Sequence, residues 1–191
     1  MEPITTTIIG EIVAVGAGWY IDSRNSNGRV EQAKEYLLSG INDDLKNSIE
    51  ICNAIKSEWE HHERVERNTL NKLKRCALTY RHNQELIPLV YQHERGEHIF
   101  KYFHEIIDIV GAMEHDQGCL NDIEAAFNDK LHSLKQHNPN ISADEAVNAV
   151  TSMLTKEQKH YYSSLRQSMT TSIKRLTELT HTAAKLDKEL Q

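Results

Sequence analysis

The sequence is poor in the residues that compact globular domains use for tight turns and dense cores. Only 8 glycines and 3 prolines occur in 191 residues, and aromatic residues make up 6% of the chain. Gly and Pro are the strongest local turn signals, so their scarcity disfavours a fold of many short strands and loops. The length corresponds to about one domain. We therefore expect elongated α-helices with one apolar stripe each, rather than a multilayer α/β domain.

Positive charge is not concentrated anywhere in the chain. The net charge is −6, and Lys and Arg residues are interspersed with acidic ones. A nucleic-acid-binding surface normally needs a basic patch, so no nucleic acid is expected as a partner. Solvated helix surfaces account for this distribution of charge.

Cysteine is also scarce, and its spacing forms no recognisable site. Cys52, Cys76 and Cys119 are an odd number of thiols, widely spaced and without a CxxC pair. We expect a reducing compartment and no structural disulfide. The chain begins Met-Glu-Pro without a positively charged leader, which predicts no secretory signal. A cytoplasmic or membrane-associated location is expected.

Sequence motifs of catalysis are missing. There is no phosphate-binding GxxxxGK[ST] loop, no GxSxG elbow and no two-histidine zinc helix. The run IVAVGAG at 12–18 resembles the start of a dinucleotide-binding turn, but Ile21 stands where the third glycine is needed. We predict no enzyme activity, no cofactor and no metal ligand.

Residues 4–21 form an apolar segment whose only charged residue is Glu11. Eighteen residues lie at the short limit for crossing a bilayer. As a helix, the segment would carry small residues every fourth position on one face and aromatic residues at its end, which suits helix contact and a membrane interface. A buried core helix, or a β-strand over 5–15, is also compatible with this composition. The candidate membrane or oligomer contacts are Ile8, Gly10, Ile12, Ala14, Val15, Gly18, Trp19 and Tyr20.

Two long segments, 42–82 and 156–190, carry apolar residues at alternating spacings of three and four. This is the coiled-coil period, and it predicts two long helices forming an antiparallel stalk in an all-α, elongated helical bundle. Either seam could instead pair with another subunit. In the first segment the seam is polar from His62 to Thr69, where Val65 and Leu70 flank it. The principal seam residues are Leu45, Ile55, Trp59, Leu73, Leu165, Leu176, Leu179 and Leu186.

The remaining segments predict shorter elements. We expect residues 1–28 to comprise the apolar segment and a polar linker. Residues 29–191 are expected to form a single helical domain. A short helix over 29–38 is expected to end at Ser39-Gly40. Residues 84–154 are expected to form a smaller helical cap with a break around Gln117-Gly118 and a turn at 138–140. Capping boxes, at 142–145 and 155–158, predict the starts of the last two helices.

Histidine is unusually common, with 11 copies. Three Glu-x-x-His pairs, Glu58–His61, Glu157–His160 and Glu178–His181, have the spacing of di-metal helical bundles, but they lie off the predicted seams. A metal-dependent enzyme is therefore the least favoured interpretation. Two histidines of the predicted cap stand four residues from an acidic one, as Glu94–His98 and His104–Asp108, an arrangement that raises histidine pKa toward neutrality and favours pH sensing. The candidate pH-sensing residues are His93, His98, His104 and His115.

Together these features predict a non-enzymatic assembly or membrane-acting protein. In this interpretation the helices form an oligomeric coiled-coil scaffold, or part of a pore or translocation apparatus, and residues 4–21 contact a bilayer or an oligomer core. The expected partner is a second copy or another helical protein. The alternative is a soluble adaptor that binds a partner protein through one seam.

Overall fold

The computed structural model describes residues 27–82 and 93–190 of the chain. Within these ranges the structure is all-α, as predicted, and contains no strand. Residues 4–21, with the eight candidate contacts from Ile8 to Tyr20, lie outside the described residues. The helices are α2 (Asn27–His62), α3 (Arg67–His82), α5 (His93–His137), α6 (Ala143–Met153) and α7 (Lys156–Leu190).

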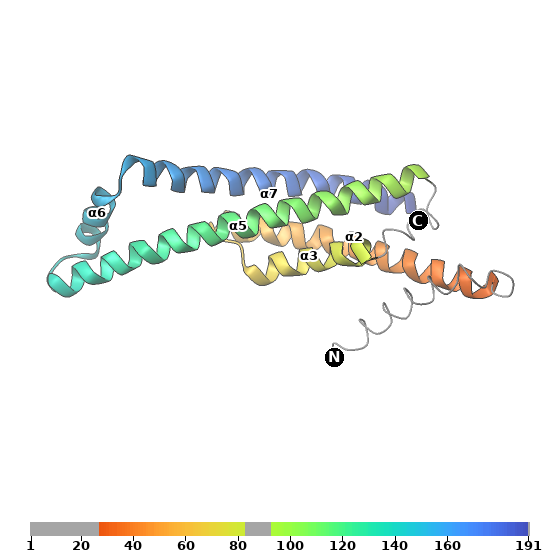
Figure 1. The fold of residues 1–191 in the computed structure, drawn as a ribbon, viewed down its shortest axis with the longest axis horizontal. Coiled ribbons are helices and arrows are strands. Elements are labelled where there is room, and N and C mark those ends of the chain that lie inside the picture. Colours follow the sequence, from red (N-terminus) through yellow and green to blue (C-terminus); the bar gives the residue numbers. More distant parts are fainter. Residues whose placement is uncertain (1–26, 83–92, 191) are drawn as a thin grey trace.

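Four of these helices form a closed ring around one apolar core. Both α2 and α5 pack against α3 and α7, so each of the four has two neighbours. Successive helices of the ring run in opposite directions (Figure 1). This arrangement is an antiparallel four-helix bundle. All eight principal seam residues, from Leu45 to Leu186, are buried in its core.

The last helix agrees closely with its expected bounds. α7 runs from Lys156 to Leu190, and its start carries the capping box in which Thr155 and Gln158 exchange hydrogen bonds. The second predicted box is also present, with Ser142 and Glu145 bonded reciprocally at the start of α6. The buried stripe of α7 follows the predicted spacing through Leu165, Met169, Ser172, Leu176, Leu179, Ala183 and Leu186.

The prediction of one continuous helix over 42–82 is wrong. α2 ends at His62, the chain turns, and α3 begins at Arg67 and packs back against α2. A continuous helix would have placed His62 and Glu66 on the buried seam, where their polar groups would need partners. Both are exposed instead, while Val65 in the turn is buried. We call residues 63–66 the α2–α3 turn.

The predicted stop at Ser39-Gly40 is also wrong, because α2 continues through it. Leu37, Ile41 and Leu45 are buried at four-residue spacing across this point. Their packing outweighs the cost of a helical glycine, which is about 1 kcal/mol.

The expected break at Gln117-Gly118 does not occur either. α5 is a single helix of 45 residues, and Met113 and Leu120 on either side of that point are buried in the same core. The first half of α5, expected to cap a stalk, forms one side of the bundle by packing against α3 and α7. The predicted turn at 138–140 is present and leads into α6.

The second half of α5 extends beyond the core and returns through α6 to α7 (Figure 1). We call residues 121–164 the arm. The structure describes every residue of the arm, and only Ala146 and Val150 in it are buried. Across 27–82 and 93–190, no helix combines the length and apolarity needed to span a bilayer.

Candidate functional site

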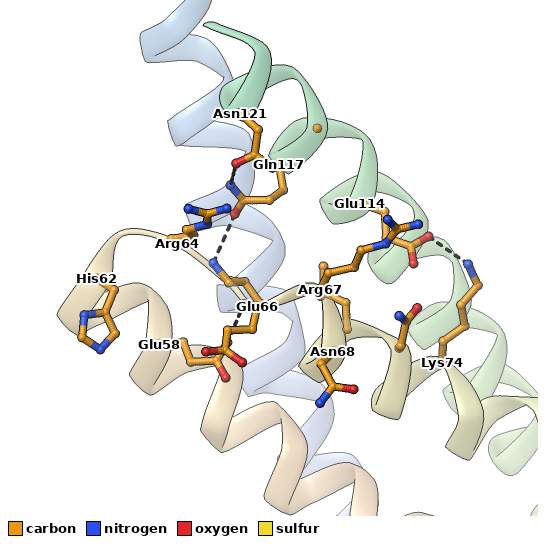
Figure 2. Close-up of a pocket in the computed structure, with 14 residues that line it drawn as sticks. Glu58, His62, Arg64, Glu66, Arg67, Asn68, Lys74, Glu114, Gln117 and Asn121 are labelled. Carbon is orange, nitrogen blue, oxygen red and sulfur yellow. Dashed lines mark hydrogen bonds and ion pairs between the residues drawn. The ribbon is translucent and has the colours of Figure 1, made fainter. Parts of the chain in front are cut away.

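A polar groove of about 840 Å³ lies where the α2–α3 turn meets α5 (Figure 2). Its walls come from the end of α2, the turn, the first turns of α3 and the middle of α5. Charged and amide side chains predominate over two apolar ones. The lining residues are Glu58, His62, Arg64, Val65, Glu66, Arg67, Asn68, Leu70, Asn71, Lys74, Glu114, Gln117, Gly118 and Asn121.

Glu58 holds the groove side of the α2–α3 turn. One of its carboxylate oxygens accepts a hydrogen bond from the backbone N–H of Glu66 at 2.8 Å, and the other accepts one from Thr69 Oγ1 at 2.6 Å. Glu66 immediately precedes α3, so the carboxylate lies at the N-terminal end of that helix, where backbone N–H groups lack helical partners. The charge of Glu58 therefore stabilises the start of α3.

Gln117 holds the same turn from α5. Its Oε1 accepts a hydrogen bond from the backbone N–H of Val65 at 3.1 Å, and its Nε2 donates to Asn121 Oδ1 at 3.1 Å (Figure 2). The Gln117 side chain is buried. The bond to Val65 satisfies a buried backbone donor that the turn removes from helical pairing. Beside it, Lys74 Nζ of α3 forms an ion pair with Glu114 at 2.8 Å.

Arg166 of α7 contacts the turn from another side. It forms an ion pair with Glu63, and this hydrogen-bonded partner lowers the pKa of the Glu63 carboxyl. The Arg166 guanidinium carbon also lies 5.8 Å from the ring centroids of Trp59 and Tyr162, within cation–π range. Glu63 has φ of 51°, the left-handed conformation that ends a helix sharply.

The polar contacts around the α2–α3 turn connect it to α2, α5 and α7. Serine, threonine, cysteine and tyrosine, which supply most nucleophiles, do not occur among the lining residues. The thiols of Cys52 and Cys76 are buried in the core, where burial raises their pKa values to about 12 and about 11 and keeps them protonated. Over 27–82 and 93–190, no three His, Cys, Asp or Glu side chains converge as a metal site.

The Glu-x-x-His pairs serve helix ends or lie in solvent. Glu58 directs both carboxylate oxygens to the α2–α3 turn, and His61 Nδ1 donates to the carbonyl of Ser57 at 2.8 Å. Glu157 lies in the first turn of α7, where a backbone N–H and the Thr155 hydroxyl lower its pKa. The third pair, Glu178 and His181, is exposed.

The candidate pH-sensing histidines are distributed along α5 rather than gathered. His98, His104 and His115 are exposed, and the first and last are 17 residues, or about 25 Å, apart on the helix. The His104 ring stacks on Phe100, with its Nε2 3.9 Å from Asp108. The side chain of His93 lies outside the described part of the structure.

Gln117 and Arg166 have no counterpart among the sequence-based candidates. Gln117 lies between the buried residues Met113 and Leu120 on the core face of α5. A polar residue at such a position is a signal that a buried partner exists. For Arg166, on a mostly exposed face of α7, we find no comparable signal.

A comparison with protein-family models, curated proteins and solved structures finds no match to this chain.

Proposed function

We propose that this chain is a non-enzymatic helical assembly protein that holds other helices against its arm. Residues 4–21 provide a second contact, in a bilayer or in the core of an oligomer. The observation that carries this proposal is the apolar stripe of α5, which continues beyond the bundle core without being fully covered.

The stripe is continuous with the core face of α5. Leu120 is 2% exposed and marks the last fully buried position. Beyond it, apolar residues at helical spacing are only half-buried, although they lie on the same face. These residues are Ile123, Phe127, Leu131 and Leu134.

The first turn of α7 leaves this stripe partly uncovered. Residues 156–160 of α7 read KEQKH, and all five are exposed. α5 and α7 also separate toward α6 (Figure 1). Further apolar side chains of the arm face solvent, with Met153 60% exposed, Tyr161 50% and Val147 42%.

Covering such a surface with another helix is energetically favourable. Completing the burial of a half-buried Leu, Ile or Phe side chain contributes roughly 1 kcal/mol. Four stripe residues and three exposed ones could together offset a substantial part of the entropic cost of association. An assembly protein requires a surface of this kind.

An adaptor that binds a different protein through the arm is the alternative. This alternative is favoured because the arm consists of residues 121–164 alone and includes none of residues 4–21. A partner protein bound to the arm would therefore leave residues 4–21 dispensable.

The test compares the full-length chain with a chain that begins at Arg24. Sedimentation velocity over a range of concentrations measures self-association, and flotation with liposomes measures membrane binding. We expect the full-length chain to associate or to float, and the shortened chain to lose membrane binding or the larger oligomers. A full-length chain that is monomeric at every concentration and stays off liposomes would contradict the assembly proposal.

A further inference from the structure

We propose that the polar groove at the α2–α3 turn binds a small phosphate ester, whose phosphoryl group is held by Arg64, Gln117 and Asn121. The site is separate from the arm and adds a ligand to the proposed assembly function. Three features carry the inference: amide donors without acceptors on the α5 wall, an arginine without an acidic partner beside them, and open space over Gly118.

The hydrogen bonds that hold the turn leave unused donors on the α5 wall of the groove. The backbone N–H of Val65 needs an acceptor, so Gln117 presents Oε1 to it and its amide nitrogen faces the other way. One hydrogen of Gln117 Nε2 goes to Asn121 Oδ1. Among the described residues, the second hydrogen of Nε2 and the Asn121 NH₂ group then have no acceptor. Because Gln117 is only 8% exposed, a ligand oxygen is a favourable partner for these donors.

Arg64 brings a full positive charge to the same wall. It lies in the α2–α3 turn, and its guanidinium is directed toward Gln117 (Figure 2). Across 27–82 and 93–190, no acidic side chain forms an ion pair with it. The guanidinium is a planar fork that matches two oxygens of a phosphoryl group. A phosphoryl group offers three strong acceptor oxygens, one more than a carboxylate, so it can accept from Arg64 and from both amides together.

The acids of the groove are mostly engaged elsewhere. Glu58 directs both oxygens to the start of α3, and Glu114 forms an ion pair with a lysine of α3. Among the described residues, the charges left in the groove are those of Arg64 and Arg67 against Glu66, a net charge of +1 with histidine neutral. This balance favours an anionic ligand.

The groove also has room for the body of an ester. Its volume of about 840 Å³ lies in the range of small-molecule sites. A Cβ added to Gly118 would meet no atom within 4 Å, so a ligand can approach the α5 wall closely there. None of the described lining residues is Phe, Tyr or Trp, whereas the amides Asn68 and Asn71 are exposed in the groove. Since no such ring is present for stacking, a hydroxyl-rich body such as a sugar fits this lining better than a nucleobase.

Isothermal titration calorimetry of the full-length chain at neutral pH tests the site, with glucose 6-phosphate, inorganic phosphate and glucose as probes. We expect glucose 6-phosphate to bind more tightly than inorganic phosphate, and glucose not to bind. Arg64→Gln should raise the dissociation constants of both phosphate probes about tenfold or more, because it removes a charge-assisted hydrogen bond. Arg75→Gln is the matched control. It removes the same charge from an exposed position of α3 outside the groove and should leave both constants unchanged.

A second pair of variants uses two glycines of α5. Gly118→Glu places a carboxylate in the open space beside the amide donors and should abolish binding of both phosphate probes. Gly111→Glu adds the same charge at another exposed position of α5, also with no atom within 4 Å of an added Cβ, and should leave binding intact. Both changes replace a helical glycine by a better helix former, so circular dichroism should show unchanged helix content in each variant.

The outcomes bear on different parts of the proposal. If neither phosphate probe binds the wild-type chain at millimolar concentration, or if both bind Arg64→Gln and Gly118→Glu as tightly as wild type, the site is overturned. Acetate that binds as tightly as inorganic phosphate overturns the choice of a phosphoryl group. Equal affinities for glucose 6-phosphate and inorganic phosphate overturn the hydroxyl-rich body and support the phosphoryl contact alone. The assembly proposal is decided separately, by sedimentation and liposome flotation.

Discussion

The hydroxyl oxygens of Ser48 and Tyr102 lie 2.5 Å apart in the core, between α2 and α5. Ser48 Oγ donates a second bond to the carbonyl of Leu45 at 2.7 Å, so the Tyr102 hydroxyl acts as the donor to Ser48. Both side chains are at most 1% exposed. Burial raises the pKa of Tyr102, and the tyrosine stays neutral.

This pair predicts an asymmetric response to mutation. Ser48→Ala leaves a buried tyrosine hydroxyl unsatisfied and should destabilise the protein by about 1–3 kcal/mol. Tyr102→Phe leaves Ser48 bonded to Leu45 and should cost less, about 0.5–1.5 kcal/mol. The double variant should cost less than the sum of the two. Urea denaturation of all four proteins measures this coupling, and strictly additive effects would contradict it.

We expect Glu58 to stabilise the α2–α3 turn, although its Glu-x-x-His spacing is that of a metal ligand. Glu58→Ala removes the acceptor of the Glu66 N–H and the Thr69 hydroxyl and should cost about 1–3 kcal/mol. The matched control is Glu60→Ala, two residues away, whose exposed ion pair with Lys56 has an N···O distance of 3.8 Å. Its cost should stay below about 0.5 kcal/mol. Equal losses in thermal denaturation would mean that Glu58 does not stabilise the turn.

The Glu63–Arg166 pair predicts a pH dependence of stability. Arg166 lowers the pKa of Glu63 below its ordinary value of 4.5, so the unfolded chain takes up this proton at higher pH than the folded one. The stabilisation is therefore complete at neutral pH and is lost as the pH falls through the depressed pKa. Glu63→Gln should lower the melting temperature at pH 7, and the difference from wild type should shrink in acid. A difference that is constant from neutral pH down to pH about 3 would exclude this linkage.

Gly118 is a position where replacement by alanine should stabilise the protein. It lies inside α5 on an exposed face, and a Cβ added there would meet no atom within 4 Å. Gly118→Ala should therefore raise the free energy of unfolding by about 0.5–1 kcal/mol, through reduced backbone freedom in the unfolded state. Gly111 has the same surroundings and serves as an independent repeat. A loss of stability in both variants would indicate that α5 needs flexibility at these positions.

The sequence was most informative where one helix carries an uninterrupted stripe. α7 and its buried positions follow from the alternating spacing and from the capping box at Thr155. Both signals are local, because a stripe and a cap depend on residues within a few turns of one another. Local patterns of this kind also predicted the Ser142 capping box and the turn after α5.

The α2–α3 turn was not predictable from spacing alone. The alternation of three and four residues continues across residues 63–66, so counting cannot distinguish one long helix from two that fold back. The polar stretch from His62 to Thr69 was the only signal, and its meaning depends on partners distant in sequence. Gln117 and Arg166, which hold the turn, are 52 and 103 residues away from Val65 and Glu63.

The closed ring of helices also determines when the core can form during synthesis. α3 packs against α2 and α5 packs against α3, both made earlier, but α2 gains its second neighbour only when α7 emerges. At about 5–20 residues per second, residues 93–155 take roughly 3 to 13 seconds to translate. For that interval the faces of α2 and α5 that later meet α7 remain in contact with water. The nascent chain is therefore most prone to aggregate after α5 is made and before α7 is complete.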